Sequence, residues 1–113
     1  ARRFHGRFAG VAGNPGSAAL RRVVWSHEAQ NDVFDISEHY DRIDPDLADE
    51  IVLRIEQSPL PLRDFPAMGE AVFADSPVRK WRIPKSPFLL FHVLADDRIE
   101  IRRVRHGASD RRG

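Results

Sequence analysis

The sequence has no cysteine, a single methionine and no long apolar run. Without cysteine the chain can form no disulfide, no thiolate metal site and no thiol nucleophile. A membrane-spanning helix needs roughly 20 consecutive apolar residues, and no stretch of this sequence approaches that length. A hydrophobic fraction of 42% among 113 residues nevertheless suffices for a core. We therefore expect one folded domain without a membrane span.

The net charge of +1 conceals a strong segregation of charge along the chain. Residues 1–22 carry five basic side chains and no acidic one, whereas residues 23–70 carry three basic and twelve acidic side chains. Residues 71–113 carry ten basic and five acidic side chains. This asymmetry indicates a charged partner, although two solvated faces of opposite sign would give the same pattern. Because acidic groups outnumber basic ones beyond residue 22, a protein target is favoured over general RNA affinity.

The first 22 residues differ from the rest of the chain. They hold four of the seven glycines and are rich in arginine, but they lack the apolar core of a secretory signal. The chain begins with alanine and its single methionine is Met68, so we expect the given N-terminus to be processed, truncated or otherwise not the biological start. We expect the chain to divide into a disordered or non-native extension at 1–22, a folded domain at 23–110 and a basic tail at 111–113.

A short β-type run at Val23-Val24-Trp25 precedes a predicted helix over roughly residues 27–43. Ser26 is suited to cap this helix, because its hydroxyl can accept from an unpaired N–H of the first turn. The apolar residues recur at helical spacing, at Ala29, Val33, Ile36, Tyr40 and Ile43. The opposite face is expected to hold Asp32, Asp35, Glu38, His39 and Arg42.

Asp44 and Pro45 restart the helical pattern as an N-cap and a helix-opening residue. The second helix is expected to run to about Ser58. Its buried stripe is predicted to consist of Ala48, Ile51, Val52 and Ile55. Two amphipathic helices with so short a link should pair as a helical hairpin.

Three β-type runs follow a proline-rich loop at residues 59–70. They are Val78 to Ile83, Phe88 to Leu94 and Arg98 to Arg105. The middle run is almost continuously apolar, which is typical of a central strand covered on both faces. Within it, His92 is expected to be a buried residue satisfied by one hydrogen bond. The order β-α-α-β-β-β predicts an α+β fold, with the hairpin packed on one face of an antiparallel sheet.

The last predicted strand ends in a basic cluster beside a histidine, formed by Arg102, Arg103, Arg105 and His106. Arg79 and Arg82 lie on another strand of the same sheet, on opposite faces, so at most one of them shares the face of His106. A histidine among guanidinium groups can do acid–base chemistry on a phosphodiester, and the same groups can bind phosphates or an acidic partner segment. Solvated sheet residues paired with acids would give the same pattern. No metal or nucleotide motif is present, and we expect no cofactor and no metal.

Five segments together resemble a known family pattern. The run from Val24 to Ala29, with Asp32, Ile36 and Tyr40, is similar to v-x-S-x-x-A-x-x-D-l-x-x-I-x-x-Y. The later matches are Pro45 with Ala48 and Ile55 to P-x-x-A, Phe65 to Gly69 to f-P-x-l-G, Val78-Arg79 to v-R, and Ile101 to Asp110 to I-l-r-V-x-H-g-a-r-D. In this order, over roughly residues 23–110, they resemble the ParE/RelE toxin superfamily on its ParE-like side, the plasmid stabilisation toxins.

The resemblance implies a cytoplasmic, growth-inhibiting toxin of a type II toxin–antitoxin system, neutralised by a cognate antitoxin encoded adjacently. ParE-like members are inhibitors of DNA gyrase, which implies action by binding a protein target. RelE-like members cut mRNA on the ribosome, and such an endonuclease is the alternative. Under that alternative the catalytic set would be Glu70, Arg79, Arg82 and His106. The implied target- or antitoxin-binding residues are Arg79, Arg82, Arg102, Arg103, Arg105 and His106.

The sequence departs from the family pattern at three positions. Leu89 lies where both branches commonly carry arginine, His92 replaces the usual tyrosine, and Glu70 follows Gly69 where arginine is common. Without the arginine that the family commonly carries at position 89, a phosphate-binding or proton-donating group is missing. An inactive or regulatory binding module of the same fold is therefore the second alternative.

Overall fold

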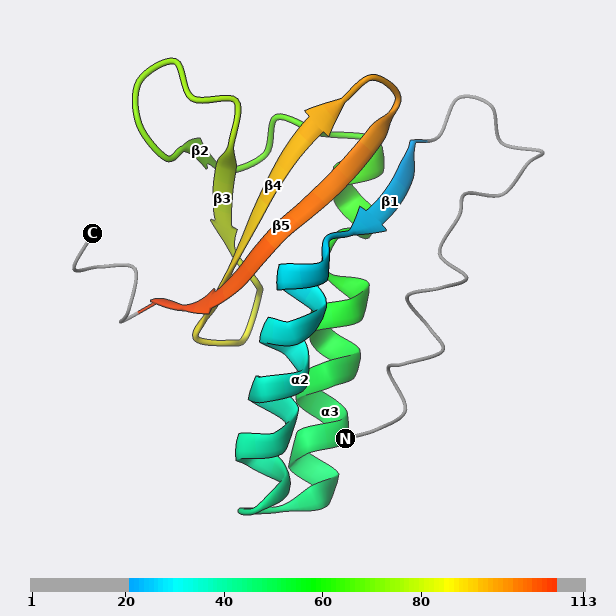
Figure 1. Cartoon of the computed structure of the whole chain (residues 1–113), viewed down its shortest axis with the longest axis vertical. Coiled ribbons are helices and arrows are strands. Elements are labelled where there is room, and N and C mark those ends of the chain that lie inside the picture. The colour runs from blue at the N-terminus through cyan, green and yellow to red at the C-terminus, as the bar shows by residue number, and fades with distance from the viewer. Residues whose placement is uncertain (1–20, 108–113) are drawn as a thin grey trace.

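The computed structural model describes residues 21–107. The predicted extension up to residue 20 and the predicted tail at 111–113 lie outside the described residues. Within 21–107 the chain forms two layers, a helical hairpin and a five-stranded sheet (Figure 1). No helix in this part of the chain is long and apolar enough to cross a membrane.

The helical hairpin consists of α2 (His27–Asp41) and α3 (Pro45–Gln57). The Ser26 hydroxyl accepts from the backbone N–H of Ala29 at 3.0 Å, so the predicted cap of α2 is confirmed. Asp44 caps α3 in the same way, since its carboxylate accepts from the N–H of Asp46 at 3.0 Å. Both helices therefore begin where the sequence predicted.

Two predictions about α2 were wrong. Ile43 is 64% exposed, because α2 ends at Asp41 and the residue falls in the turn before α3. Asp32 was placed on the outward face, but its carboxylate faces β5 (Arg98–His106) and its side chain is only 14% exposed. The small residue Ser37 is fully buried instead, and its hydroxyl donates to the backbone carbonyl of Phe34 at 3.2 Å.

The sheet has the strand order β1-β5-β4-β3-β2. Its other members are β1 (Arg22–Trp25), β2 (Glu70–Ala71), β3 (Arg79–Arg82) and β4 (Phe88–Ala95). Three of the four pairings are antiparallel as predicted, whereas β1 runs parallel to β5. The two-residue strand β2 was not predicted, because it is too short to show an alternating pattern.

The core lies between the sheet and the hairpin. It is closed at one end by the short 3-10 helix η1 (Leu60–Arg63), whose Leu62 is fully buried within the predicted loop. The central strand β4 is buried along most of its length, as its apolar run predicted. The core residues are Val23, Trp25, Ala29, Val33, Val52, Ile55, Leu62, Ile83, Phe88, Leu90, Ile99, Ile101 and Val104.

Candidate functional site

A β-bulge in β5 decides which side of the sheet the C-terminal basic residues occupy. Ile101 lies opposite His92 and Arg103 lies opposite Phe91, so Arg102 has no partner on β4. The extra residue shifts the alternation of the strand, because each one-residue slip moves all later side chains to the other face. Val104 therefore points into the core.

Beyond the bulge, Arg105 and Arg82 share one face of the sheet. Both lie directly opposite Leu89, one on each neighbouring strand, so the three side chains form a row across the sheet. Neither guanidinium has an ion pair with another residue in 21–107. Two unneutralised cations thus flank an apolar side chain at the position where the family pattern carries arginine.

The other three predicted arginines are engaged within the domain. Arg103 donates to Asp32 through Nε at 2.8 Å and through a terminal nitrogen at 3.0 Å, and these hydrogen bonds raise the pKa of Arg103. Arg102 donates to Glu100 at 3.1 Å. Glu100 also binds Arg98 at 2.7 Å, and the Arg98 hydrogen bond is the main reason that the pKa of Glu100 is lowered.

His106 points to the other face of the sheet, towards the helices. Its ring meets Phe88 edge to face at a centroid distance of 5.7 Å, and Phe88 meets Tyr40 of α2 in the same way at 6.3 Å. Arg82 still reaches this end of the strand. A Cβ on Gly107 would lie 3.2 Å from both terminal nitrogens of Arg82, so the guanidinium packs against the backbone next to His106.

The four residues of the ribonuclease alternative are not brought together. Arg79 lies opposite His92, whereas His106 lies opposite Phe88. These two partners are four residues apart on β4, so Arg79 and His106 are separated by about 13 Å along the strand direction alone. Glu70 is on β2, three strands from β5 and therefore about 14 Å away. Only Arg82 and His106 share one end of the sheet.

Arg79 and His92 instead fasten the loop before β2. A terminal nitrogen of Arg79 donates to the carbonyl of Gly69 at 2.8 Å, and Nε2 of His92 donates to the carbonyl of Pro66 at 3.1 Å. His92 is fully buried, as predicted, and its one hydrogen bond fixes the Nε2–H tautomer. Burial lowers the pKa of His92, and the neighbouring Arg79 charge lowers it further.

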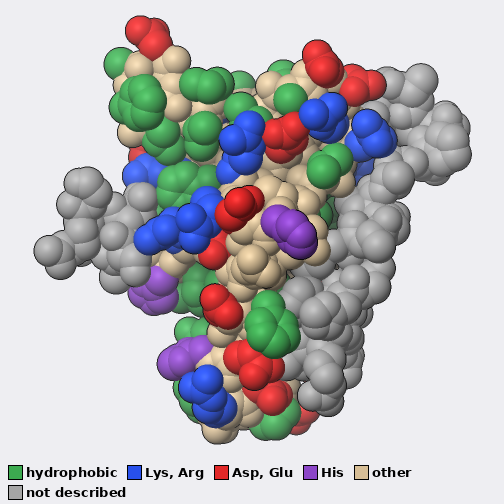
Figure 2. Space-filling view, viewed as in Figure 1, with side chains coloured by type: hydrophobic (Ala, Val, Ile, Leu, Met, Phe, Trp, Pro, Cys, Tyr) green, Lys and Arg blue, Asp and Glu red, His purple; other side chains and the backbone are tan. Residues whose placement is uncertain are grey.

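Charge is distributed between the two layers as the sequence predicted. On the face shown in Figure 2, most basic side chains lie over the strands, while acidic side chains lie over the helical hairpin and also among the basic ones over the strands. A shallow hollow of about 200 Å³ lies at the edge of β5, next to α2. It is lined by Asp32, Arg103, Val104, Arg105 and His106.

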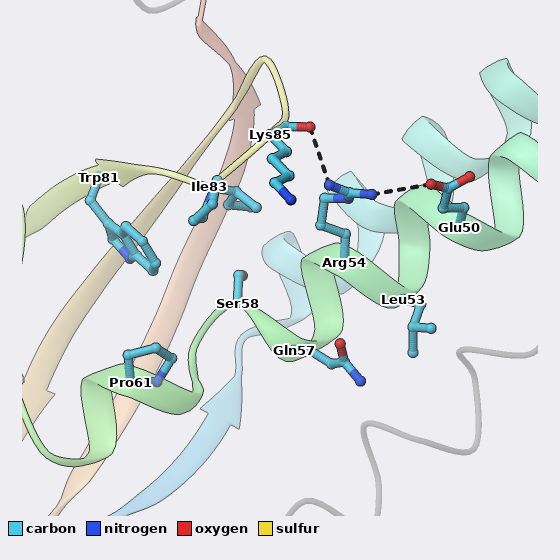
Figure 3. A pocket seen from close by; sticks show the side chains of 10 residues that line it. Glu50, Leu53, Arg54, Gln57, Ser58, Pro61, Trp81, Ile83 and Lys85 are labelled. Atoms are coloured by element: carbon cyan, nitrogen blue, oxygen red, sulfur yellow. Dashed lines mark hydrogen bonds and ion pairs between the residues drawn. The ribbon is translucent and has the colours of Figure 1, made fainter.

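A second surface, the α3 groove, lies between α3 and the turn that joins β3 to β4. We define it as two hollows of about 450 and 200 Å³ that share the residues Glu50, Arg54 and Lys85. Figure 3 shows the larger hollow, with Trp81 and Ile83 facing α3 across the opening. The smaller hollow continues towards the start of α3. The groove shares no lining residue with Arg82, Arg105 or His106.

Sequence reasoning missed Asp32 and the α3 groove. Asp32 sits at a helix position that the apolar stripe leaves polar, and no local signal indicates that an edge of β5 lies beside it. The groove depends on how far α3 and η1 cover the sheet, which no spacing records. One signal of the groove was present in the sequence, since the apolar residue Leu53 lies on the polar side of the predicted stripe. In the structure its side chain is 42% exposed.

No metal-binding cluster of three or more His, Asp or Glu side chains occurs among residues 21–107. The end of the sheet that carries Arg82, Arg105 and His106 offers two guanidinium groups, one imidazole and hydrogen-bonding groups. Such a surface suits recognition of an anionic group or an acidic protein segment.

Comparisons with known proteins agree with this geometry. The family model described as the ParE toxin of the type II toxin–antitoxin system parDE matches residues 23–111. A solved structure, the chromosomal ParDE toxin–antitoxin system from P. aeruginosa, is similar with a TM-score of 0.68 and 21% identity, over 78% of this chain and 97% of that chain. No curated protein matches the sequence. The family match spans most of the chain and coincides with the folded domain, and we conclude that the chain belongs to the ParE toxin family of type II toxin–antitoxin systems.

Proposed function

We propose that this toxin acts by binding a protein target, DNA gyrase, and that a cognate antitoxin neutralises it. The observation that supports the proposal is the row Arg82–Leu89–Arg105, in which two cations without an ion pair in 21–107 lie on either side of Leu89. Leu89 itself is buried, so the row presents chiefly its two charges, which suit an acidic protein surface. It requires no catalytic group.

The distribution of the other candidate residues supports binding over catalysis. A general acid and a general base must both lie within hydrogen-bonding reach of the reacting group. By strand geometry Arg79 lies about 13 Å along the strands from the His106 end of the sheet, and Glu70 lies about 14 Å across the sheet from β5. Arg79 also donates to the loop carbonyl of Gly69. Two of the four groups in the ribonuclease alternative are thus far from the other two.

The test is to induce the full chain in a host that lacks its antitoxin. Growth should stop, and gyrase–DNA cleavage complexes should accumulate. Purified protein in excess should change the supercoiling activity of purified gyrase. Unchanged topoisomerase activity under those conditions would contradict the gyrase target.

The contact of Arg82 with the backbone beside His106 keeps one alternative worth testing, a ribosome-dependent mRNA endonuclease. Under that alternative the substitution His106→Ala should abolish toxicity while antitoxin binding survives. Mapping of RNA 5′ ends after induction decides the matter, since an endonuclease must create new ends. If no new ends form, the alternative fails.

An antitoxin segment that folds on binding would complete the system. Coupled folding buries apolar surface at an ordering cost, so such a segment can be disordered when free. The neighbouring reading frame offers a direct check. A short frame with a DNA-binding start and an acidic C-terminal part is expected there, and its product should restore growth.

A further inference from the structure

The sheet has one covered face and one open face. The hairpin and η1 pack against the covered face, where Leu90, Ile99 and Ile101 join the core. Among residues 21–107 no helix packs on the other face, which we call the open face (Figure 1). Leu89 and Val93 alternate with the core residues of β4 and so point to the open face, but both are buried. A partner on this face therefore meets chiefly polar and charged groups.

Two cations of the open face, Arg82 and Arg105, form what we call the cation row. They lie opposite Leu89 on the two neighbouring strands. Two strand spacings separate their Cα atoms by about 9.6 Å. Both side chains are exposed, and neither forms an ion pair within residues 21–107. The row therefore offers two accessible positive charges at a fixed separation.

The helix α2 carries two anions, Glu28 and Asp35, which we call the acidic row. They are seven residues apart, nearly two turns, so their Cα atoms are separated by about 10.5 Å. Asp32, which binds the edge of β5, lies between them in the sequence. Glu28 and Asp35 are four residues before it and three after it, so both lie on one flank of the helix, away from the buried Ala29 and Val33. Both are exposed, and neither is ion-paired in the part of the chain that the structure describes.

The two rows match in charge and in length. Their separations differ by only about 1 Å, so both carboxylates of one row can meet both guanidinium groups of the other at the same time. Figure 2 shows acidic side chains over the hairpin and most basic side chains over the strands on a single face of the molecule. Every copy of the chain carries both rows, and a net charge of +1 gives little overall repulsion between copies.

We propose that a second copy of this chain docks head to tail, with its acidic row on the cation row of the first copy. The Glu28 and Asp35 carboxylates of one copy accept hydrogen bonds from the Arg82 and Arg105 guanidinium groups of the other. Exposed ion pairs are individually weak and are screened by salt. The association is therefore reversible, depends on concentration and is lost at high salt.

Self-association covers a surface that the proposed function needs, and this consequence rests on that proposed function. The cation row is the surface assigned to the acidic target. A copy whose cation row is occupied by another copy cannot use it to bind the target. The associated form is therefore a store of inactive toxin, and dilution releases the active single chain.

Sedimentation velocity of the full chain over a range of concentrations tests the association. At about 10 mM salt the Debye length is about 30 Å, and at about 1 M it is about 3 Å. The sedimentation coefficient should rise with protein concentration at the lower salt and should stay that of a single chain at the higher. A single chain at millimolar concentration in low salt overturns the proposal, and so does association that is unchanged at about 1 M salt.

Charge reversal identifies the two rows. Arg82→Glu/Arg105→Glu and Glu28→Lys/Asp35→Lys should each weaken self-association at least about tenfold, because each brings like charges together. The two variant proteins should associate again when they are mixed, since each then supplies the charges that the other lacks. Recovery on mixing also shows that both variants are folded. If the mixture stays dissociated although both variants have the circular dichroism of the unaltered chain, the proposal is overturned.

Matched controls place the same charge changes outside the two rows. Asp64→Lys/Asp97→Lys, at exposed positions, should weaken self-association much less than Glu28→Lys/Asp35→Lys does. Arg63→Glu/Lys85→Glu should likewise have a much smaller effect than reversal of the cation row. An equal loss in the controls would show that net charge sets the association, and would overturn the proposal.

Inhibition of purified gyrase separates this inference from the proposed function. The Glu28→Lys/Asp35→Lys chain keeps its cation row, so its inhibition at low salt should rise in proportion to its concentration. That of the unaltered chain should level off as association sets in. If neither protein affects gyrase, the proposed target is wrong and the sedimentation result stands. If the unaltered chain inhibits gyrase but never associates, this inference is wrong and the proposed target stands.

Discussion

Asp32 and Arg103, 71 positions apart in the chain, are joined by two hydrogen bonds of 2.8 and 3.0 Å. The same Asp32 carboxylate accepts from the backbone N–H of Val104 at 2.9 Å. β1 ends its pairing with β5 opposite Ile101, so beyond that point no strand among residues 21–107 lies along this edge of β5. Asp32 takes the place of the missing strand and fixes α2 to the sheet.

This relationship predicts a stability effect at a residue that looks exposed in sequence. Asp32→Ala leaves the N–H of Val104 and the guanidinium of Arg103 without their acceptor, and we expect a loss of about 1–3 kcal/mol in the free energy of unfolding. Urea denaturation measures it. Asp35→Ala, three residues further along α2 and exposed, is the matched control and should change the value by less than about 0.5 kcal/mol. Equal effects of the two substitutions would contradict the edge-capping role.

Stability should depend on pH through His92. Burial holds the pKa of His92 in the folded protein below the ordinary value of 6.5, so the unfolded chain binds a proton that the folded chain does not. The free energy of unfolding should therefore fall as the pH drops below about 6.5, by at most about 1.4 kcal/mol per pH unit, until the folded-state pKa is reached.

Urea denaturation at several pH values between about 7.5 and 5 tests this dependence. His92→Phe should remove the His92 part of the slope, even if the lost bond to Pro66 lowers stability at every pH. His39→Phe, at an exposed site on α2, is the control and should keep the slope of the unaltered chain. Parallel curves for all three proteins would show that His92 does not set this dependence.

The conformation of Gly69 should tolerate no side chain. Its φ is +86°, and a Cβ at this position would lie 2.2 Å from the backbone oxygen of Lys80. Gly69→Ala should therefore destabilise the fold by at least about 2 kcal/mol, because both backbone strain and a clash with backbone act together. A Cβ on Gly107 would lie 3.1 Å from the backbone oxygen of Pro87 and 3.2 Å from the flexible end of Arg82, a milder approach, so Gly107→Ala should cost less. Thermal unfolding of the two variants gives the comparison, and a larger effect at Gly107 would contradict it.

The cation row should matter for toxicity and not for folding. The double variant Arg82→Gln/Arg105→Gln removes two charges with no ion pair in 21–107, so its unfolding free energy should stay within about 0.5 kcal/mol. Growth inhibition on induction should weaken markedly, because complementary charge speeds and strengthens association. Arg42→Gln, exposed on the hairpin, is the matched control. Full toxicity of the double variant would move the target-binding surface elsewhere.

Much of the fold could be predicted from sequence because its signals are local. Ser26 and Asp44 mark helix starts, since a capping oxygen acts on the next turn only. The apolar run of β4 marks a central strand. The limits are equally physical. Ile43 fits the helical spacing, but spacing cannot say that α2 ends two residues earlier, and two-residue β2 carries no periodicity.

The candidate site shows the same division. The basic cluster near His106 was visible as composition, but its members separate in the structure, where Arg102 and Arg103 bind acids and Arg105 and His106 point to opposite faces. The bulge at Arg102 is the reason. It exchanges the faces of the residues that follow, and whether a bulge forms depends on pairing with β4, which the sequence of β5 alone does not contain.

The sequence by itself determined the two helices, the four longer strands, their order and the segregation of charge between helices and strands, because propensity, capping and periodicity act within a few residues. Only the tertiary structure decided which cations remain unneutralised, where Asp32 points and that the α3 groove exists. Each of these depends on atoms brought together from positions far apart in the chain. Such proximity follows from packing the hairpin on the sheet, and no local pattern records it.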